Sequence, residues 1–203
     1  MMNRRIAVLI SGRGSNLQAL IDAINDGRLS AEIAIVISNK ADAYGLERAR
    51  AAGIATLTIA HRDHATRDAF EEVLVRELRA RDVSLVCLAG FMRLLGRTFL
   101  DAFPERILNI HPSLLPSFPG VDAQRQAWEH GAKVAGATVH FVTGELDGGP
   151  IVAQSAVPVL DDDTPETLAA RILVEEHRIY PQAVSAVLDG GWTIDGRRFR
   201  RGR

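Results

Sequence analysis

The chain has 203 residues, of which 47% are hydrophobic and 24% charged, and its formal net charge is −1. These values suit one soluble globular domain with a sizeable core, and the balanced charge argues against nucleic acid or an anionic membrane as a partner. The one cysteine, Cys87, lies in an apolar run, so we interpret it as buried rather than reactive. We expect no signal peptide and no transmembrane helix, which makes the cytoplasm the expected location.

The first half of the chain alternates between short apolar runs and amphipathic stripes. Continuous apolar runs are typical of strands that are buried on both faces, and stripes with a period near 3.6 indicate helices. Alternation of the two predicts an α/β fold with a doubly wound, Rossmann-like, mostly parallel sheet and right-handed crossovers. The predicted strands span residues 6–10, 33–37, 56–59, 83–88 and 107–110.

The pattern changes after the loop at residues 112–121. A helix is predicted over 122–130, and two strands follow, with only residues 144–150 between them. That gap is too short for a helical crossover, so the sequence predicts an antiparallel addition. A last helix opens at Thr164, and Pro181 is expected to kink or restart it. Residues 197–203 are predicted to be a solvated basic tail of a single domain spanning 1–203, and disorder of this tail is left open.

A glycine loop at residues 11–16 follows the first strand and precedes a helix. Free backbone N–H groups at a helix N-terminus form an anion site, most often for phosphate. The loop is neither a P-loop nor a full dinucleotide fingerprint, because Leu17 stands where a third glycine would be needed and no acidic residue ends the second strand. A phosphate monoester is therefore favoured over a dinucleotide, and a tight turn with a side-chain cap is the alternative.

Asn109 and His111 are two residues apart, so they point to one face of a strand that Pro112 ends. Ligands of open parallel sheets bind at the carboxyl ends of the strands, and we interpret this pair as functional. A histidine that acts near neutral pH needs a carboxylate beside it, and Asp147 is the candidate. An ordinary turn aspartate is the alternative for Asp147, which precedes two glycines and a proline.

The other histidines give weaker signals. On spacing alone, His61, His64 and His130 are expected at the surface and His140 is expected to be structural, while His177 is undecided. No histidine or cysteine spacing matches a zinc site, so no metal is expected.

Six motifs, in order along the chain, together resemble a known family. The family is phosphoribosylglycinamide formyltransferase, the folate-dependent enzyme of purine synthesis, and the resemblance runs from about Arg5 to Gly191. Two of the motifs, Asn-x-His-Pro-Ser and Leu-Asp-Gly-Gly, are shared with other 10-formyltetrahydrofolate enzymes. The Gly-x-Gly-Ser-Asn-Leu loop and the chain length favour the phosphoribosylglycinamide formyltransferase family over these other enzymes. The motifs are residues 10–17, 38–43, 88–93, 108–116, 140–142 and 146–150.

The resemblance implies transfer of a formyl group from 10-formyltetrahydrofolate, as co-substrate, to the amine of glycinamide ribonucleotide. Asn109 and a protonated His111 would stabilise the oxyanion, and Asp147 would pair with the histidine. The ribonucleotide would bind to Gly14, Ser15, Asn16 and Glu176. The residues implied for the folate are Arg67, Met92, Arg93, Leu94, Leu95, Asn109, Val142, Thr143, Gly144, Glu145, Leu146 and Asp147.

The sequence departs from the family in the middle loop, where Asp122 and Gln124 stand at positions that carry histidine in relatives. The alternatives within folate chemistry are a 10-formyltetrahydrofolate hydrolase and the catalytic domain of a methionyl-tRNA formyltransferase. The alternative from another class is a nucleotide-binding module or oxidoreductase on the same fold. Small molecules are the expected partners, with no nucleic acid and no membrane, and a homodimer is left open.

Overall fold

A computed structural model of the chain describes residues 3–202, and within that range nine strands join into one sheet with the order β3-β2-β1-β4-β5-β6-β7-β9-β8. The strands are β1 (Arg5–Ile10), β2 (Glu32–Ser38), β3 (Thr56–Thr58), β4 (Leu85–Leu88), β5 (Ile107–His111), β6 (Val134–Phe141), β7 (Ile151–Pro158), β8 (Trp192–Asp195) and β9 (Arg198–Arg201). The helices are α1 (Ser15–Asn25), α2 (Tyr44–Ala51), α3 (Arg67–Arg79), α4 (Arg97–Leu100), α5 (Ala123–Glu129) and α6 (Pro165–Leu188), with a short 3-10 helix, η1 (His61–Asp63).

Strands β1 to β5 pair with one another in parallel, which confirms the predicted doubly wound sheet. The chain runs outward from β1 to β3 and then crosses back to place β4 on the other side of β1. This reversal is the topological switch point at which ligands bind in such sheets. The loops after β1 and β4 therefore meet at one crevice.

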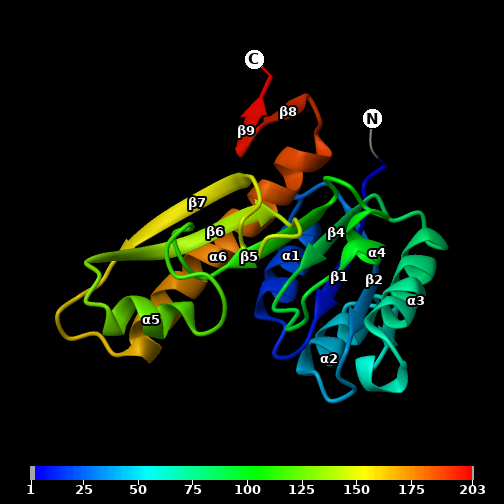
Figure 1. The fold of residues 1–203 in the computed structure, drawn as a ribbon, viewed down its shortest axis with the longest axis horizontal. Coiled ribbons are helices and arrows are strands. Elements are labelled where there is room, and N and C mark those ends of the chain that lie inside the picture. The colour runs from blue at the N-terminus through cyan, green and yellow to red at the C-terminus, as the bar shows by residue number, and fades with distance from the viewer. Residues whose placement is uncertain (1–2, 203) are drawn as a thin grey trace.

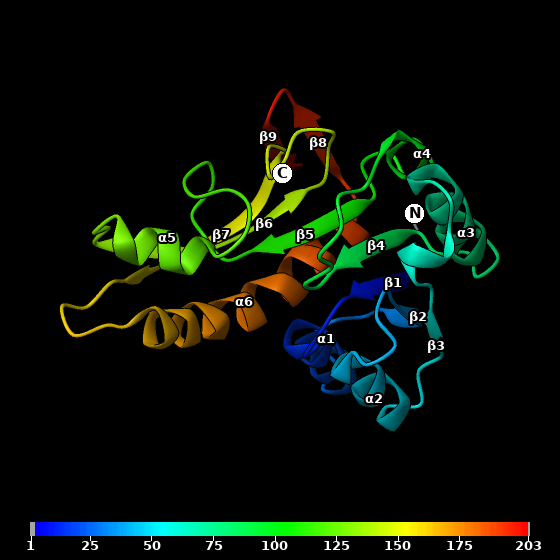
Figure 2. The same ribbon diagram turned by 60° about the horizontal axis from the view of Figure 1, so that its bottom comes forward.

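Helices cover both faces of the parallel strands (Figure 1). Figure 2 shows α1, α2 and α6 on one side of the sheet and α3 and α4 on the other, in agreement with the two buried clusters. Ile6, Val8 and Ile10 of β1 pack toward α1 and α6, whereas Ala7 and Leu9 pack toward α3. A strand covered in this way has no polar face, which explains its continuous apolar sequence.

The predicted antiparallel addition is confirmed, because β6 pairs antiparallel with both β5 and β7. Asn109 lies directly opposite His140, and His111 lies opposite Thr138. Residues directly opposite one another in an antiparallel pair project to the same face of the sheet. The register of β5 and β6 therefore places an asparagine and two histidines on one face.

The end of the chain differs from the predictions in two respects. Helix α6 continues through Pro181, so the proline does not restart it; the cost of an internal proline, about 3 kcal/mol, is offset by burial of this stretch in the core. Residues 198–201, predicted to lie in a solvated basic tail, form β9. Phe199 packs against Phe141 and Trp192, with ring centroids 5.9 and 5.6 Å away. The arginines of β9 are exposed, and residue 203 lies outside the described residues.

None of the helices within residues 3–202 is both long enough and apolar enough to cross a membrane.

Candidate functional site

The glycine loop makes the turn that its sequence predicts. Gly14 is the residue before α1 and has a φ of 70°, in the left-handed region that favours glycine. A Cβ at this position would lie 2.6 Å from Cα of Gly45. The first N–H groups of α1, at Ser15 and Asn16, have no acceptor within the helix and are available to an anion.

Helix α2 forms hydrogen bonds to this loop, and the sequence did not predict this contact. The backbone N–H of Gly45 donates to the carbonyl of Gly12 at 2.9 Å, and Nε of Arg48 donates to the carbonyl of Arg13 at 2.9 Å. A Cβ on Gly45 would lie 2.5 Å from Cδ1 of Ile10. A glycine in the first turn of a helix was the available signal, because glycine there marks a close backbone approach.

Asn16 and Glu176, both predicted for the ribonucleotide, are in direct contact although 160 residues separate them. Nδ2 of Asn16 donates to Oε2 of Glu176 at 2.6 Å, and both residues are buried. Burial raises the pKa of the Glu176 carboxyl, and the hydrogen bond from Asn16 opposes this shift. Within residues 3–202, Oδ1 of Asn16 has no hydrogen-bond partner. The pair joins the start of α1 to the middle of α6.

Three large apolar side chains predicted for the folate are exposed. Met92 and Leu94, in the loop after β4, are each 66% exposed, and Leu146, in the loop after β6, is 54% exposed. Exposed apolar side chains of this size suit a surface that an apolar ligand covers. The loop after β4 is anchored by the buried carboxylate of Glu71, which accepts hydrogen bonds from Gly96 N–H at 2.6 Å and Phe99 N–H at 3.1 Å.

The remaining residues predicted for the folate lie around these two loops. Arg67, the first residue of α3, is exposed and lies beside Gly96. Leu95 and Val142 are half-buried and pack against the core that α3 covers. The exposed members of this group are Arg93, Thr143, Gly144 and Glu145.

Four polar side chains meet on the face of the sheet opposite α6. Asn109 and His111 come from β5, and the residue between them, Ile110, packs into the core that α6 shares. His140 comes from β6, and Asp147 comes from the loop that returns from β6 to β7. The structure therefore brings together all three predicted catalytic residues, with one further histidine.

Asp147 lies between the two imidazoles. Its Oδ2 is 3.5 Å from Nδ1 of His111, and its Oδ1 is 3.6 Å from Nε2 of His140. Gly120 N–H also donates to Oδ2 at 2.8 Å. Burial acts to raise the pKa of Asp147, but the contacts with His140 and Gly120 N–H and the charge of His111 outweigh it, so the pKa is lowered. A carboxylate is thus kept ionised beside two buried histidines.

The hydrogen bonds of the histidines define which ring nitrogens carry hydrogen. Nε2 of His111 is 2.9 Å from the carbonyl of Phe118, and Nδ1 of His140 is 2.9 Å from the carbonyl of Phe141. A carbonyl only accepts, so both of these nitrogens are N–H donors. In the neutral ring, Nε2 of His140 then accepts from Nδ2 of Asn109, 3.3 Å away.

His140 was interpreted from the sequence as a structural histidine, yet it contacts the predicted catalytic residues. Its position inside a strand hid this, because the contact depends on the register of β6 against β5. Of the histidines expected at the surface, His61 and His64 are half-buried and His130 is exposed. Cys87 is fully buried and burial raises the pKa of its thiol to about 12, which confirms its interpretation.

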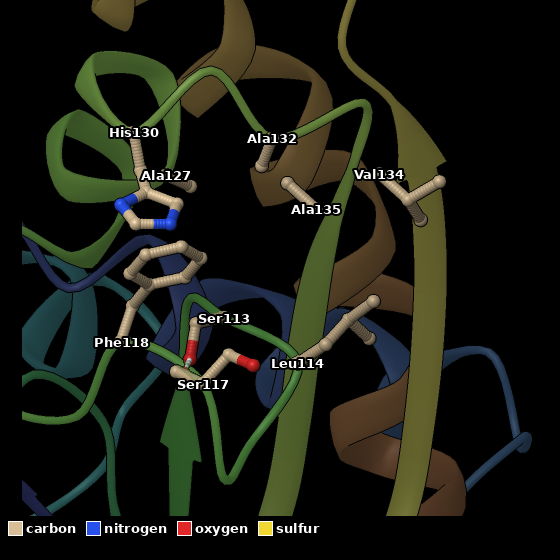
Figure 3. Close-up of a pocket in the computed structure, with 9 residues that line it drawn as sticks. All are labelled: Ser113, Leu114, Ser117, Phe118, Ala127, His130, Ala132, Val134 and Ala135. Carbon is tan, nitrogen blue, oxygen red and sulfur yellow. Dashed lines mark hydrogen bonds between the residues drawn. The ribbon is translucent and has the colours of Figure 1, made fainter.

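A cavity of about 310 Å³ lies behind the loop that follows β5 (Figure 3). The rings of Phe118 and His130 both line the cavity and contact one another edge to face, with centroids 5.6 Å apart. The carbonyl of Phe118 accepts the hydrogen bond from His111. Phe118 thus contacts both the cavity and the cluster of polar side chains at β5. The lining residues are Ser113, Leu114, Ser117, Phe118, Ala127, His130, Ala132, Val134 and Ala135, and they include none of the residues predicted for the site.

Among the residues from 3 to 202, no three His, Cys, Asp or Glu side chains form a group that could hold a metal ion. Independence from metal remains a prediction.

The cluster at β5 is suited to stabilise the oxyanion that forms when an acyl or formyl group is transferred. The family model described as formyl transferase matches residues 4–184, and the chain belongs to this family, as the motifs predicted. The phosphoribosylglycinamide formyltransferase of Escherichia coli (strain K12) is 48% identical over 192 residues, which cover 95% of this chain and 88% of that protein.

A crystal structure of glycinamide ribonucleotide transformylase 1 from Symbiobacterium toebii has a TM-score of 0.97 at 57% identity, covering 100% of this chain and 95% of that one. The trifunctional purine biosynthetic protein adenosine-3 of Drosophila melanogaster is 49% identical over 189 residues. The chain spans only 14% of that longer relative.

Proposed function

We propose that the protein transfers a formyl group from 10-formyltetrahydrofolate to the amine of N1-(5-phospho-D-ribosyl)glycinamide, a step of purine biosynthesis. Membership of the formyl transferase family supports the reaction class, and the names of the full-length relatives support the acceptor. The observation that carries the proposal is the cluster of Asn109, His111, His140 and Asp147, in which both histidines are buried.

Attack of the amine on the formyl carbon gives a tetrahedral intermediate with negative charge on the formyl oxygen. Asn109 has two amide hydrogens, of which one faces His140, so the second is available to the oxyanion. His111 donates from Nε2 once this N–H exchanges the Phe118 carbonyl for the oxyanion. The carboxylate of Asp147, 3.5 Å from Nδ1 of His111, stabilises positive charge that develops on the ring during the reaction.

A proton must also leave the attacking amine and reach N10 of the departing folate. His111, or a water held by Asp147, is positioned to carry it. The low exposure of His111, His140 and Asp147 keeps bulk water from competing for the formyl carbon.

The two substrates use different parts of the crevice. The phosphate of the ribonucleotide binds to the N–H groups of residues 14–16, and Glu176 binds the ribose hydroxyls. The pteridine lies against Met92, Leu94 and Leu146 and hydrogen-bonds to backbone of residues 142–147. The cytoplasmic location and the independence from nucleic acid and membranes stay predictions, and a homodimer stays open.

Purified protein is expected to formylate glycinamide ribonucleotide from 10-formyltetrahydrofolate in buffer that contains a chelator and no added metal. Product is measured by mass as formyl-glycinamide ribonucleotide. Release of formate with no formylated product would contradict the proposal and favour a hydrolase. Turnover that the chelator removes and a metal restores would contradict metal independence alone.

A further inference from the structure

Three segments that follow neighbouring strands meet at Ser11, directly after β1. The hydroxyl of Ser11 donates to Oδ1 of Asn39 at 2.6 Å, and the backbone N–H of Met92 donates to Oγ of Ser11 at 2.8 Å. Asn39 follows β2 and Met92 lies in the loop after β4, on the two sides of β1. One hydroxyl therefore joins the carboxyl ends of three adjacent strands.

The relay, defined here as Asn39, Ser11 and the N–H of Met92, is shielded from water. Ser11 and Asn39 are each 5% exposed. Hydrogen bonds of this kind are strengthened by the low local dielectric, and removing one partner leaves buried polar groups unpaired. The position of the loop after β4 relative to the glycine loop is therefore held by specific bonds rather than by packing alone.

The two segments that the relay joins are those to which the two substrates are assigned. Ser11 opens the glycine loop, and Met92 opens the loop with exposed apolar side chains. We propose that Ser11 is a positioning residue that fixes the ribonucleotide site relative to the folate site. This inference rests on the proposed function, which assigns the substrates to residues 14–16 and 92–95.

The chemistry explains why such a bond matters for rate more than for affinity. Each substrate can bind its own loop when the relay is broken, because neither binding surface includes the Ser11 hydroxyl. Formyl transfer, in contrast, needs the amine and the formyl carbon in near-attack geometry, and a misplacement of about 1 Å costs roughly 10²-fold in rate. Loss of the relay should therefore lower kcat while the separate affinities are maintained.

The test compares Ser11→Ala with Ser11→Thr, which keeps a hydroxyl, and with Ser84→Ala as the matched control. Ser84 is also 5% exposed, and its hydroxyl donates to the carbonyls of Asn3 and Arg5, at the opposite end of β1 and β4. Single-turnover rates, the Kd of each substrate alone by calorimetry, and Tm are measured for the three variants.

Ser11→Ala is expected to lower the single-turnover rate roughly 10- to 100-fold while each Kd changes less than about threefold. Ser11→Thr should restore most of the rate. Ser84→Ala should lower Tm by about as much as Ser11→Ala does, and it should leave the single-turnover rate unchanged. A wild-type rate in folded Ser11→Ala, or loss of both affinities with no further loss of rate, would overturn the proposal.

If Ser11→Ala does not fold, Asn39→Ala removes only the acceptor of the relay. The same pattern, a reduced rate with maintained affinities, is then expected at smaller size, and its absence overturns the proposal. Amide chemical shifts separate this outcome from failure of the proposed function. Should the ribonucleotide leave residues 14–16 unperturbed, or the folate leave residues 92–95 unperturbed, the substrate assignment fails. Perturbation at both places with an unchanged Ser11→Ala rate overturns the relay alone.

Discussion

The parallel and antiparallel halves of the sheet contribute to the site in different ways. In the parallel half, β1 to β4, the candidate groups are mainly backbone N–H groups and exposed side chains in the segments after strands, together with the buried Asn16 at the start of α1. In the antiparallel half they are side chains in mutual contact, the buried His140 within β6 and Asp147, whose side chain is 10% exposed, in the loop between β6 and β7. Strand β5 belongs to both halves, since it pairs with β4 on one side and β6 on the other.

This difference separates binding from chemistry. A loop after a parallel strand can hold a substrate through its backbone, whereas setting the charge of a histidine requires buried side chains from a second element. Substitutions that disturb the substrate-contacting groups of the parallel half should therefore act on the affinity for substrate, and those on β5 and in the antiparallel half should act on turnover. Ser11 and Asn39 are the exception, because they position two loops and contact neither substrate.

The largest effect is expected for His111→Ala, at the junction of the two halves. The substitution removes an oxyanion donor, so kcat should fall by at least two to three orders of magnitude. Calorimetry should show nearly unchanged ribonucleotide binding, because His111 lies outside the glycine loop. A loss of binding as large as the loss of rate would mean that the residue is structural.

Asp147→Asn should have the next largest effect, roughly 10²-fold on kcat, because a neutral amide cannot stabilise the histidine cation. The amide oxygen can still accept from Gly120 N–H, so Tm should change little. Steady-state kinetics at saturating substrates and a thermal melt measure the two quantities. Unchanged kcat would remove Asp147 from the mechanism.

Gly45→Ala tests the parallel half. The new Cβ would lie 3.1 Å from Cα of Gly14 and 2.5 Å from the side chain of Ile10, which forces the glycine loop to shift. Overpacking of this kind costs about 1–3 kcal/mol, so KM for the ribonucleotide should rise roughly tenfold. Arg50→Ala, on the exposed side of the same helix, is the control. A fall in kcat with unchanged KM would break the separation of the two halves.

The smallest effect on turnover is expected for Asp163→Asn, at the start of α6. Asp163 is buried and bound to Arg171 at 2.6 Å. The Arg171 guanidinium holds the pKa of Asp163 well below its usual range, against the effect of burial. A folded-state pKa below the unfolded value of about 3.9 stabilises the fold above that pH, and the contribution is lost as the pH falls further.

Asp163→Asn should therefore lower Tm at pH 7, and the difference from wild type should shrink below about pH 4. Turnover per folded molecule should be unchanged. The matched control is Asp161→Asn, which breaks the exposed ion pair with Lys133 and should leave Tm unaltered. A Tm difference that grows on acidification would contradict the assigned sign.

The same comparison shows what the sequence could predict. A buried parallel strand and the loop after it consist of contiguous residues, so the glycine loop was predicted directly from the sequence. The apolar residues after β4 were assigned to the folate through the family resemblance. His140 was not predicted as part of the site. Its contact with Asn109 depends on the register between β5 and β6, and a pattern within one stretch of sequence does not contain that register. Strands β8 and β9 were missed because each has only four residues. Their packing also depends on a contact between the rings of Phe199 and Phe141, which are far apart in the sequence. The contact of α2 with the glycine loop was also missed, because it joins residues that are far apart in the sequence.

The pairing of Asn109 with His140 also limits how this chain can gain or lose residues. A slip of one residue in an antiparallel pair turns every side chain of the strand to the other face. The irregularity in β6, between Val139 and His140, occurs in its pairing with β7, and the pairing with β5 stays regular. Insertions and deletions should therefore be absorbed in exposed loops, whereas the number of residues between His140 and Asp147 should stay fixed.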